Sequence, residues 1–201
     1  MSIAPDGRIV AAGFLKKGSD AQDSSHFAVA RYLPDGRLDP SFSRDGRATV
    51  DFGYGNDIAY GLAVRGRSII ATGSTVVAAE RVPSVALVRL GWGGGLVNGF
   101  GRRRVLPSPG GGIGRAVLTQ PDGRILVAGR AYSDPSQDAS DWTLLRYGRI
   151  GALDRSFGGD GIVVADFGTG EDSARALAFH DGRILAAGVI YSSQGPARYL
   201  P

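Results

Sequence analysis

Short apolar runs, separated by glycine and Asp-Gly pairs, extend along the whole chain. Segment 125–129 is continuously apolar after an Asp-Gly pair, whereas segment 27–32 (FAVARY) alternates bulky side chains with alanine. A short continuous run indicates a buried strand, and alternation indicates a strand with one buried face. Asp-Gly provides the positive φ that a tight hairpin turn needs. Segment 174–179 comes closest to a helical pattern but is too short, so an all-β chain is predicted.

The pattern repeats at a nearly constant interval. The string DGRIVAAG at 6–13 returns as DGRILVAG at 122–129 and DGRILAAG at 181–188, with a worn copy at 66–73. The glycines that close these strings are 60, 56 and 59 residues apart. Four short antiparallel strands in each such unit are typical of a β-propeller blade, whereas a β-solenoid has shorter repeats without hairpin turns.

A second string follows the first in each unit. It reads FAVARY and then LDPSF in the first copy, WTLLRY and then LDRSF in the third, and VALVRL with GF in a weaker second copy. We therefore predict one β-propeller-like domain over 1–201. Its predicted units of four-stranded antiparallel blades cover approximately 1–58, 59–115, 116–174 and, in part, 175–201.

These units amount to about 3.5 repeats of 56–60 residues, whereas closed propellers usually have about 4–8 blades. Three arrangements are consistent with that number: a fragment of a longer ring, a homodimer that completes one ring, or an open arc. An open arc would leave strand edges unpaired. We therefore favour the fragment and the homodimer, about equally.

The strings DGRILVAG and RYxxDGxLDxSF resemble the bacterial delta-60 repeat family, a β-propeller-like family of unassigned activity. The resemblance covers nearly the whole chain, and the first and third copies match well. The second copy departs from the pattern: segment 91–95 (GWGGG) replaces the Pro-Asp-Gly turn, Asn98 stands near the expected serine, and Arg102–Arg104 replace Asp-Gly. These departures predict a distorted second blade, whereas the resemblance favours a secreted or cell-surface protein.

Composition excludes several classes of site. The chain has no Cys, one Met and two His, which leaves no thiolate zinc site and almost no histidine metal site. Lys16 and Lys17 are the only lysines among 23 basic residues, and the net charge is only +4. No signal peptide and no apolar stretch long enough to span a membrane is found in this chain. We expect no cofactor.

The two histidines and the serine beside one of them are the candidates for nucleophilic chemistry. His180 precedes an Asp-Gly turn, and His26 precedes a strand, so we predict a turn residue and a surface residue. Asp23, Ser25 and His26 have the residue types of a hydrolytic triad. However, a triad needs groups that converge in space around an oxyanion hole, so we predict no catalytic residue here.

Acidic and glycine-rich segments suggest calcium or phosphate sites. Asp35 and Asp39 flank a tight turn, and Asp134, Asp138 and Asp141 form a second acidic loop. A calcium loop needs six to eight oxygen ligands at suitable spacing, so turn chemistry is the preferred interpretation of both. Segments 91–101 and 110–114 lack the Lys-Ser or Lys-Thr of a phosphate loop and are predicted to be long loops.

Arginines form two further candidate groups. Arg102–Arg104, near Trp92 and Phe100, is the best nucleic-acid candidate, but the small charge excess favours a solvated or ion-paired loop. A second set recurs at one strand position. We interpret it as structural, with each arginine paired to a turn aspartate: Arg31, Arg89, Arg146 and Arg198.

Two hypotheses for function remain. The first is a non-catalytic binding or structural module for a protein or carbohydrate ligand at an undetermined site, which the missing acid–base, metal and cofactor signals favour. The second is a propeller hydrolase or lyase acting on a glycan or lactone. Its candidate carboxylates recur between repeats, which is more typical of a structural role: Asp51, Asp57, Asp166 and Asp172.

Overall fold

The computed structural model describes residues 1–17, 24–53, 55–76, 82–105, 107, 110–168 and 170–191. Within these ranges every regular element is a β-strand, and no helix is long and apolar enough to cross a membrane. The strands form three four-stranded sheets and one two-stranded sheet, all with antiparallel neighbours. The all-β, four-stranded prediction is therefore confirmed.

The three four-stranded sheets are called blades 1, 2 and 3. Blade 1 contains β1 (Ser2–Ile3), β2 (Ile9–Lys17), β3 (Ser24–Tyr32) and β4 (Arg47–Val50). Blade 2 contains β5 (Asp57–Arg65), β6 (Ser68–Val76), β7 (Pro83–Gly91) and β8 (Arg102–Val105). Blade 3 contains β9 (Gly112–Thr119), β10 (Ile125–Tyr132), β11 (Ser140–Tyr147) and β12 (Ile162–Ala165). The last sheet is the hairpin of β13 (Ser173–His180) and β14 (Arg183–Val189).

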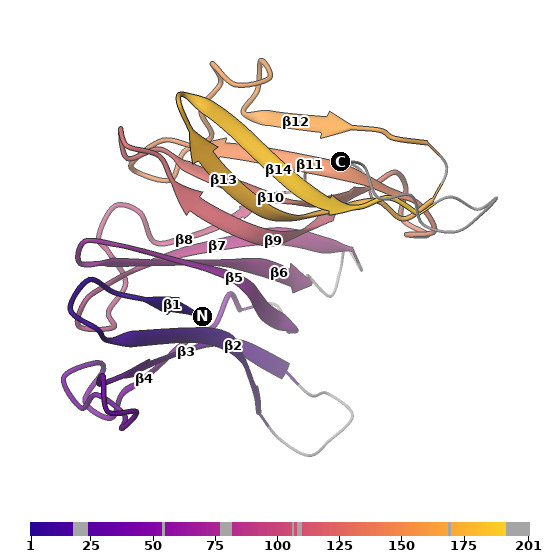
Figure 1. The fold of residues 1–201 in the computed structure, drawn as a ribbon. Helices are drawn as coiled ribbons and strands as arrows, with labels where there is room; N and C mark the ends of the chain where they lie inside the picture. Colours follow the sequence, from indigo (N-terminus) through magenta and orange to yellow (C-terminus); the bar gives the residue numbers. More distant parts are fainter. Residues whose placement is uncertain are drawn as a thin grey trace.

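The sheets follow one another in chain order, from the indigo strands at the bottom of Figure 1 to the orange and yellow strands at the top. Each blade therefore packs face to face on the next, and the repeat in the sequence becomes a repeat in space. The division into exact repeat units stays a prediction, since strand positions alone do not define where one unit ends.

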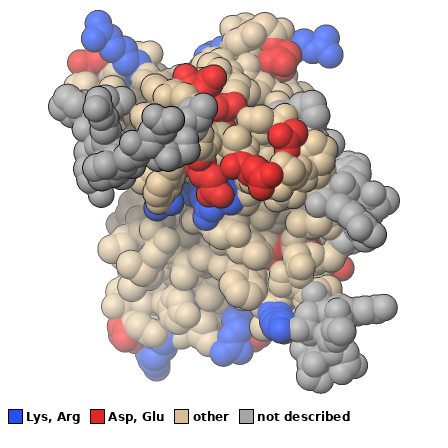
Figure 2. All heavy atoms as spheres, turned by 90° about the vertical axis from the view of Figure 1, so that its right-hand side faces the viewer, with Lys and Arg blue, Asp and Glu red and all other residues tan. Residues whose placement is uncertain are grey.

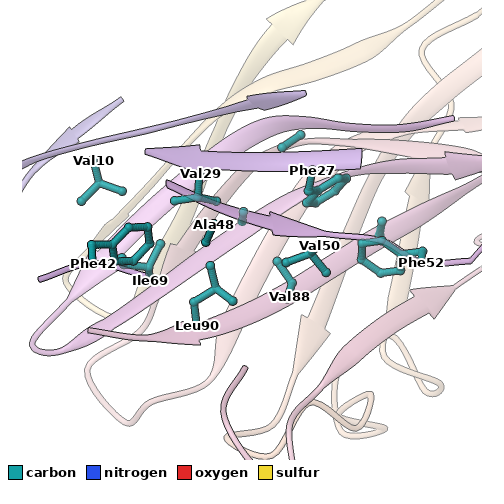
Figure 3. Close-up of a cluster of buried hydrophobic side chains, with 13 residues drawn as sticks. Val10, Phe27, Val29, Phe42, Ala48, Val50, Phe52, Ile69, Val88 and Leu90 are labelled. Atoms are coloured by element: carbon teal, nitrogen blue, oxygen red, sulfur yellow. The ribbon is translucent and has the colours of Figure 1, made fainter. Parts of the chain in front are cut away.

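A hydrophobic core lies in each gap between blades. Between blades 1 and 2, Phe27 and Val29 pack with Val88 and Leu90 (Figure 3). Between blades 2 and 3, a second core includes Leu87 from β7 together with side chains of β10 and β11. Neighbouring residues of a strand point to opposite faces. Blade 2 is consequently buried on both faces, and almost every residue of its two middle strands, β6 and β7, is buried.

The glycine that closes each apolar run allows two backbones to approach closely. A Cβ on Gly73 would lie 1.8 Å from the Ile58 carbonyl oxygen, and one on Gly129 would lie 1.8 Å from that of Ile113. Beside Gly73 the register between β5 and β6 shifts by one residue, and beside Gly129 the register between β9 and β10 does the same. Gly13 is different, because β1 has two residues and a Cβ there meets nothing within 4 Å.

One predicted loop is partly a strand. Segment 110–114 was expected to form a loop, but β9 begins at Gly112 and pairs with β10 through Ala131. Glycine weakens a strand because it has no side chain to pack. Here Gly114 is required by proximity, since a Cβ would lie 2.4 Å from the Thr72 hydroxyl oxygen.

Candidate functional site

A buried arginine connects blade 1 to blade 2. Arg31, 1% exposed, donates from Nε to an Asp39 carboxylate oxygen at 2.9 Å. That carboxylate also accepts from Arg8 Nε at 2.8 Å and from Ser41 Oγ at 2.6 Å. The guanidinium donates to the Trp92 carbonyl oxygen across the gap and lies 4.5 Å from the centroid of its ring. The cluster therefore fixes the turn after β3 against the next blade.

The charges of this cluster compensate one another. Burial would raise the pKa of the Asp39 carboxyl, but hydrogen bonds from Ser41 and Arg8 and the charge of Arg31 hold that pKa well below its usual range. Burial lowers the pKa of the Arg31 guanidinium, against the opposing effect of Asp39. Two buried opposite charges that are fully hydrogen-bonded form a structural unit, and removal of one leaves the other uncompensated.

Blade 3 repeats the cluster in a more exposed form. Arg146 donates from Nε to Asp154 at 2.8 Å, and their side chains are 16% and 14% exposed. Asp154 also lies 2.9 Å from Arg124 Nε and accepts from Ser156 Oγ at 2.7 Å. The predicted pairing of the recurring arginine with a turn aspartate is thus confirmed in blades 1 and 3. The fourth member, Arg198, lies outside the described residues.

Blade 2 keeps the arginine but has lost its partners. The strand registers show which residues of the three blades are equivalent. In addition, the N–H of Asp39, Val97 or Asp154 donates to the carbonyl oxygen of the strand arginine in its own blade. The replacements in blade 2 are Ser68 for Arg8, Val97 for Asp39 and Gly99 for Ser41. Gly99, not Asn98, therefore stands at the serine position. The prediction of a paired aspartate is wrong for Arg89, because the aligned residue is apolar.

The contacts of Arg89 are all to neutral oxygens. Its Nε and Nη2 both donate to Ser68 Oγ, at 3.1 and 2.9 Å, and its Nη1 donates to the Arg149 carbonyl oxygen at 3.3 Å. Among the residues that the structure describes, no carboxylate forms an ion pair with Arg89. The positive charge that Asp39 neutralises in blade 1 is thus left without a counter-charge.

A pocket of about 510 Å³ opens beside Arg89, between blades 2 and 3. It lies at the end of the sheets where the β5–β6 and β9–β10 turns meet. Three cations line it, and two hydroxyl and two apolar side chains also contribute: Arg65, Arg89, Arg149, Ser68, Thr119, Ile70 and Ile125. This pocket is the candidate binding site.

The pocket carries a surplus of positive charge. Its single lining carboxylate, Asp122, is already held by Arg124 at 2.6 Å. Arg65 donates to the Gln120 and Pro121 carbonyl oxygens, and Arg149 Nε donates to that of Asp122. Backbone oxygens orient these guanidinium groups but do not neutralise them. An anion is therefore the complementary ligand.

Sequence reasoning did not identify this pocket. It included Arg89 in the recurring set but gave it the same structural role as the other members, and it did not single out Arg65 or Arg149. The available signal was the departure of the second copy from the repeat, at the positions that surround the arginine in the other copies.

Arg102 and Arg103, of the three consecutive arginines, do not share a basic face. They were predicted to lie in a loop, but Arg102 begins β8, which pairs with β7. Arg102 donates to the Asp51 carbonyl oxygen in blade 1, whereas Arg103 donates to that of Ile150 in blade 3, at 2.9 Å. Strand alternation sends the two side chains to opposite faces, so they cannot bind one phosphate backbone together.

The triad candidates have structural contacts. Ser25 is buried, and its Oγ donates to the Asp57 carbonyl oxygen at 3.1 Å, as Ser140 does to Asp172 in blade 3 at 3.0 Å. His26 was predicted to be a surface residue, but its side chain is only 16% exposed and lies 3.7 Å from an Asp51 oxygen. Asp23 lies outside the described residues.

The remaining histidine is exposed beside its turn. His180 ends β13, and its side chain is 78% exposed, 3.2 Å from Asp181. Gly182, the second residue of the Asp-Gly turn, has a φ of +74°, as such a turn requires. His180 was predicted to be a turn residue, but it is the last strand residue before the turn and pairs with Arg183.

The acidic loops are held together by local hydrogen bonds. Asp35 accepts from the backbone and side chain of Arg37, and Asp134 accepts from Ser136. Figure 2 shows acidic side chains gathered over the upper part of the face on the right-hand side of Figure 1. Among the described residues, no group of three acidic or histidine side chains could hold a metal ion.

The carboxylates considered for catalysis support turns. Asp57 and Asp172 are fully buried and accept backbone N–H groups from Phe52 and Tyr191, at 2.8 and 3.1 Å. Burial raises the pKa of both carboxyls. Asp51 and its counterpart in blade 3 accept the N–H two residues later. The N–H contact of Asp51 therefore recurs in blade 3, as does the serine contact to the carbonyl oxygen of Asp57, which is the behaviour of structural residues.

A family model, described as a domain of unknown function (DUF5122) beta-propeller, matches residues 4–42 and 120–157. The matched stretches end at Phe42 and Phe157, whose rings lie against the arginine of the complete Arg–Asp–Ser cluster in blades 1 and 3. The corresponding part of blade 2 lies outside both stretches. Together with the four sheets, the match shows a β-propeller repeat fold. A search of curated proteins finds no match to the chain.

Proposed function

We propose that the chain is a non-catalytic β-propeller repeat module that binds an anionic ligand in the pocket between blades 2 and 3. The observation that supports this function is the set of three arginines around a volume of about 510 Å³, whose single lining carboxylate among the described residues, Asp122, is paired with Arg124. Ligand pockets commonly have volumes of about 300–1,000 Å³. Membership of the delta-60 family and a secreted or cell-surface location are parts of this proposal that rest on the resemblance of the repeat strings.

The competing enzyme hypothesis has weaker support. General acid–base catalysis needs a proton-transferring group positioned at the substrate. Asp57 and Asp172, the buried candidate carboxylates, accept hydrogen bonds from backbone N–H groups and do not line this pocket. Binding without chemistry is therefore the function that the arginine pocket supports best.

Calorimetric titration of the protein with anionic and neutral ligands tests the proposal. Galacturonate oligosaccharides and an acidic peptide are the anionic probes, and galactose oligosaccharides are the neutral control. We expect the anionic probes to bind, with an affinity that decreases as NaCl screens the charges. Arg149→Ala should weaken binding by about tenfold, the loss of one charge-assisted contact.

Arg37→Ala is the matched control, because Arg37 is 79% exposed and lies outside the pocket. It should leave the affinity unchanged. Binding of neutral and anionic probes with equal affinity, or equal losses in Arg37→Ala and Arg149→Ala, would refute the proposal.

Self-association into a homodimer is part of the same proposal. The face of blade 1 turned away from blade 2 carries an apolar groove of about 210 Å³ lined by Ala11, Gly13, Ala28 and Ala30, among others. The corresponding positions of blade 2 include Ala71 and Val88, which blade 1 buries completely. The uncovered face therefore continues the interface that already joins successive blades.

Hairpin β13–β14 offers a matching surface. Leu185, 54% exposed, stands at the repeat position of Val10, which is buried against blade 2. A second copy can thus place this hairpin on the open face of blade 1. Light scattering should give a mass of about twice 20.9 kDa, and Ala28→Arg should return it to the monomer value. A wild-type protein that stays monomeric at all concentrations would exclude the homodimer.

A further inference from the structure

We infer that the ligand enters the pocket through a carboxylate group, which acts on Arg89 as Asp39 acts on Arg31. This inference rests on the proposed binding function and specifies the chemistry of the ligand. The blade that lost its own carboxylate would then recover one from outside the chain.

The unused hydrogen-bonding capacity of Arg89 is the first argument. In blade 1 the Nε and Nη2 atoms of Arg31 reach two different oxygens, of Asp39 and Ser41, at 2.9 and 2.8 Å. In blade 2 the same two atoms of Arg89 share the single Oγ of Ser68. A guanidinium edge matches the two oxygens of a carboxylate, so one hydroxyl oxygen satisfies it incompletely.

The coordinated loss of three polar partners is the second argument. Replacement of arginine by Ser68 and of aspartate by Val97 removes one charge of each sign but leaves Arg89 charged. The side-chain volume beside Arg89 also decreases, since Ser68 replaces an arginine. Ser68 lines the pocket together with Arg89, whereas Val97 and Gly99 are not among the lining residues. Charge and space therefore become available at the same point.

The rest of the lining suggests the remainder of the ligand. Thr119 Oγ1 is buried and has no hydrogen-bond partner among the described residues. It lines the pocket together with the apolar side chains of Ile70 and Ile125. A buried polar atom without a partner is costly, and a ligand hydroxyl would satisfy it. A ring that carries a carboxylate and hydroxyl groups, as a hexuronic acid does, matches all of these groups.

Restoring the internal carboxylate tests the inference directly. In Val97→Asp the new side chain stands where Asp39 stands in blade 1 and competes for Arg89. Titration with digalacturonate should then show affinity at least about tenfold weaker than in the wild type. Val97→Asn, with an uncharged side chain of the same shape, is the matched control and should bind within about threefold of the wild type.

A second measurement needs no variant. Digalacturonate methyl ester has the same rings and hydroxyls but no charged carboxylates, and it should bind at least about tenfold more weakly. Galacturonate monomer against the disaccharide distinguishes a free acid from the end of a longer glycan. Equal binding of acid and ester overturns the inference, whether or not Val97→Asp folds.

The outcomes separate this inference from the proposed function. If the acidic peptide binds and Arg149→Ala weakens its binding, but Val97→Asp has no effect, the pocket binds anionic ligands. The inference that Arg89 binds a ligand carboxylate is then refuted. If no anionic probe binds the wild-type protein, both proposals fail.

Discussion

Blades 1 and 2 present the same strand arginine in two different environments. Arg31 is 1% exposed and bonded to a carboxylate, a hydroxyl and a carbonyl oxygen, with Trp92 against its face. Arg89 keeps only a hydroxyl and a carbonyl oxygen and borders a pocket. The comparison teaches that a recurring residue is structural where its repeat supplies every partner. It becomes available for binding where the partners are lost.

The largest expected difference between blades concerns the glycine that closes each apolar run. Gly129→Ala should cost about 4 kcal/mol or more in the free energy of unfolding, because its Cβ would overlap the Ile113 carbonyl oxygen 1.8 Å away. Gly13→Ala should change it by less than about 1 kcal/mol, since nothing lies within 4 Å. Urea denaturation measures both. Equal effects would mean that a backbone segment also lies against Gly13 in blade 1, as β9 lies against Gly129 in blade 3.

The two equivalent arginines should differ next most. Arg31→Ala removes a buried charge that Asp39 balances, and breaking a buried pair costs about 3–5 kcal/mol. Arg89→Ala removes contacts to neutral oxygens and should cost about 1 kcal/mol. Thermal and urea unfolding of the two variants gives the values. A loss in Arg89→Ala as large as that in Arg31→Ala would show that Arg89 is structural too.

The acidic partners test the same contrast between blades 1 and 3. Asp39→Asn should destabilise by about 3 kcal/mol, because both partners are nearly inaccessible to solvent. Asp154→Asn should cost about 1 kcal/mol, since its pair with Arg146 is partly exposed and screened by water. Denaturant titration at pH 7 distinguishes them. Similar values would indicate that burial does not govern these pairs.

The pH dependence of stability is the smallest effect. The pKa of Asp39 lies below its unfolded value, so its contribution is present above about pH 4, the unfolded pKa, and is lost as the pH falls further. The wild-type protein should therefore lose stability between pH 4 and pH 3, and Asp39→Asn should lose less over that interval. Parallel curves would contradict the assignment.

Burial gives the carboxyls of Asp57 and Asp172 an effect on the pH dependence of stability that is opposite to that of Asp39. Because burial raises their pKa, their contribution is present at low pH and is lost as the pH rises through the folded value. Asp57→Asn should therefore flatten the decline in stability above pH 4, where the aspartate of the wild-type protein ionises. The amide oxygen can still accept the Phe52 N–H bond.

Much of the fold was predictable because its causes are local. Asp-Gly turns, alternating strands and a constant spacing each depend on a few neighbouring residues, so blades of four antiparallel strands could be expected. The errors came from strand pairing within a blade: Gly112 begins β9 and Arg102 begins β8, because the neighbouring strands β10 and β7 of the same sheets pair with them. The local sequence around these residues is a poor strand former.

The candidate site shows the same division. The sequence by itself determined the repeat period, most of the strand positions, the turn glycines and the departure of the second copy from the others. Only the tertiary structure decided that this departure leaves Arg89 without a carboxylate and brings it beside Arg65 and Arg149 at one pocket. Charge compensation depends on distances between atoms in different turns and blades, and these distances exist only after the blades have packed.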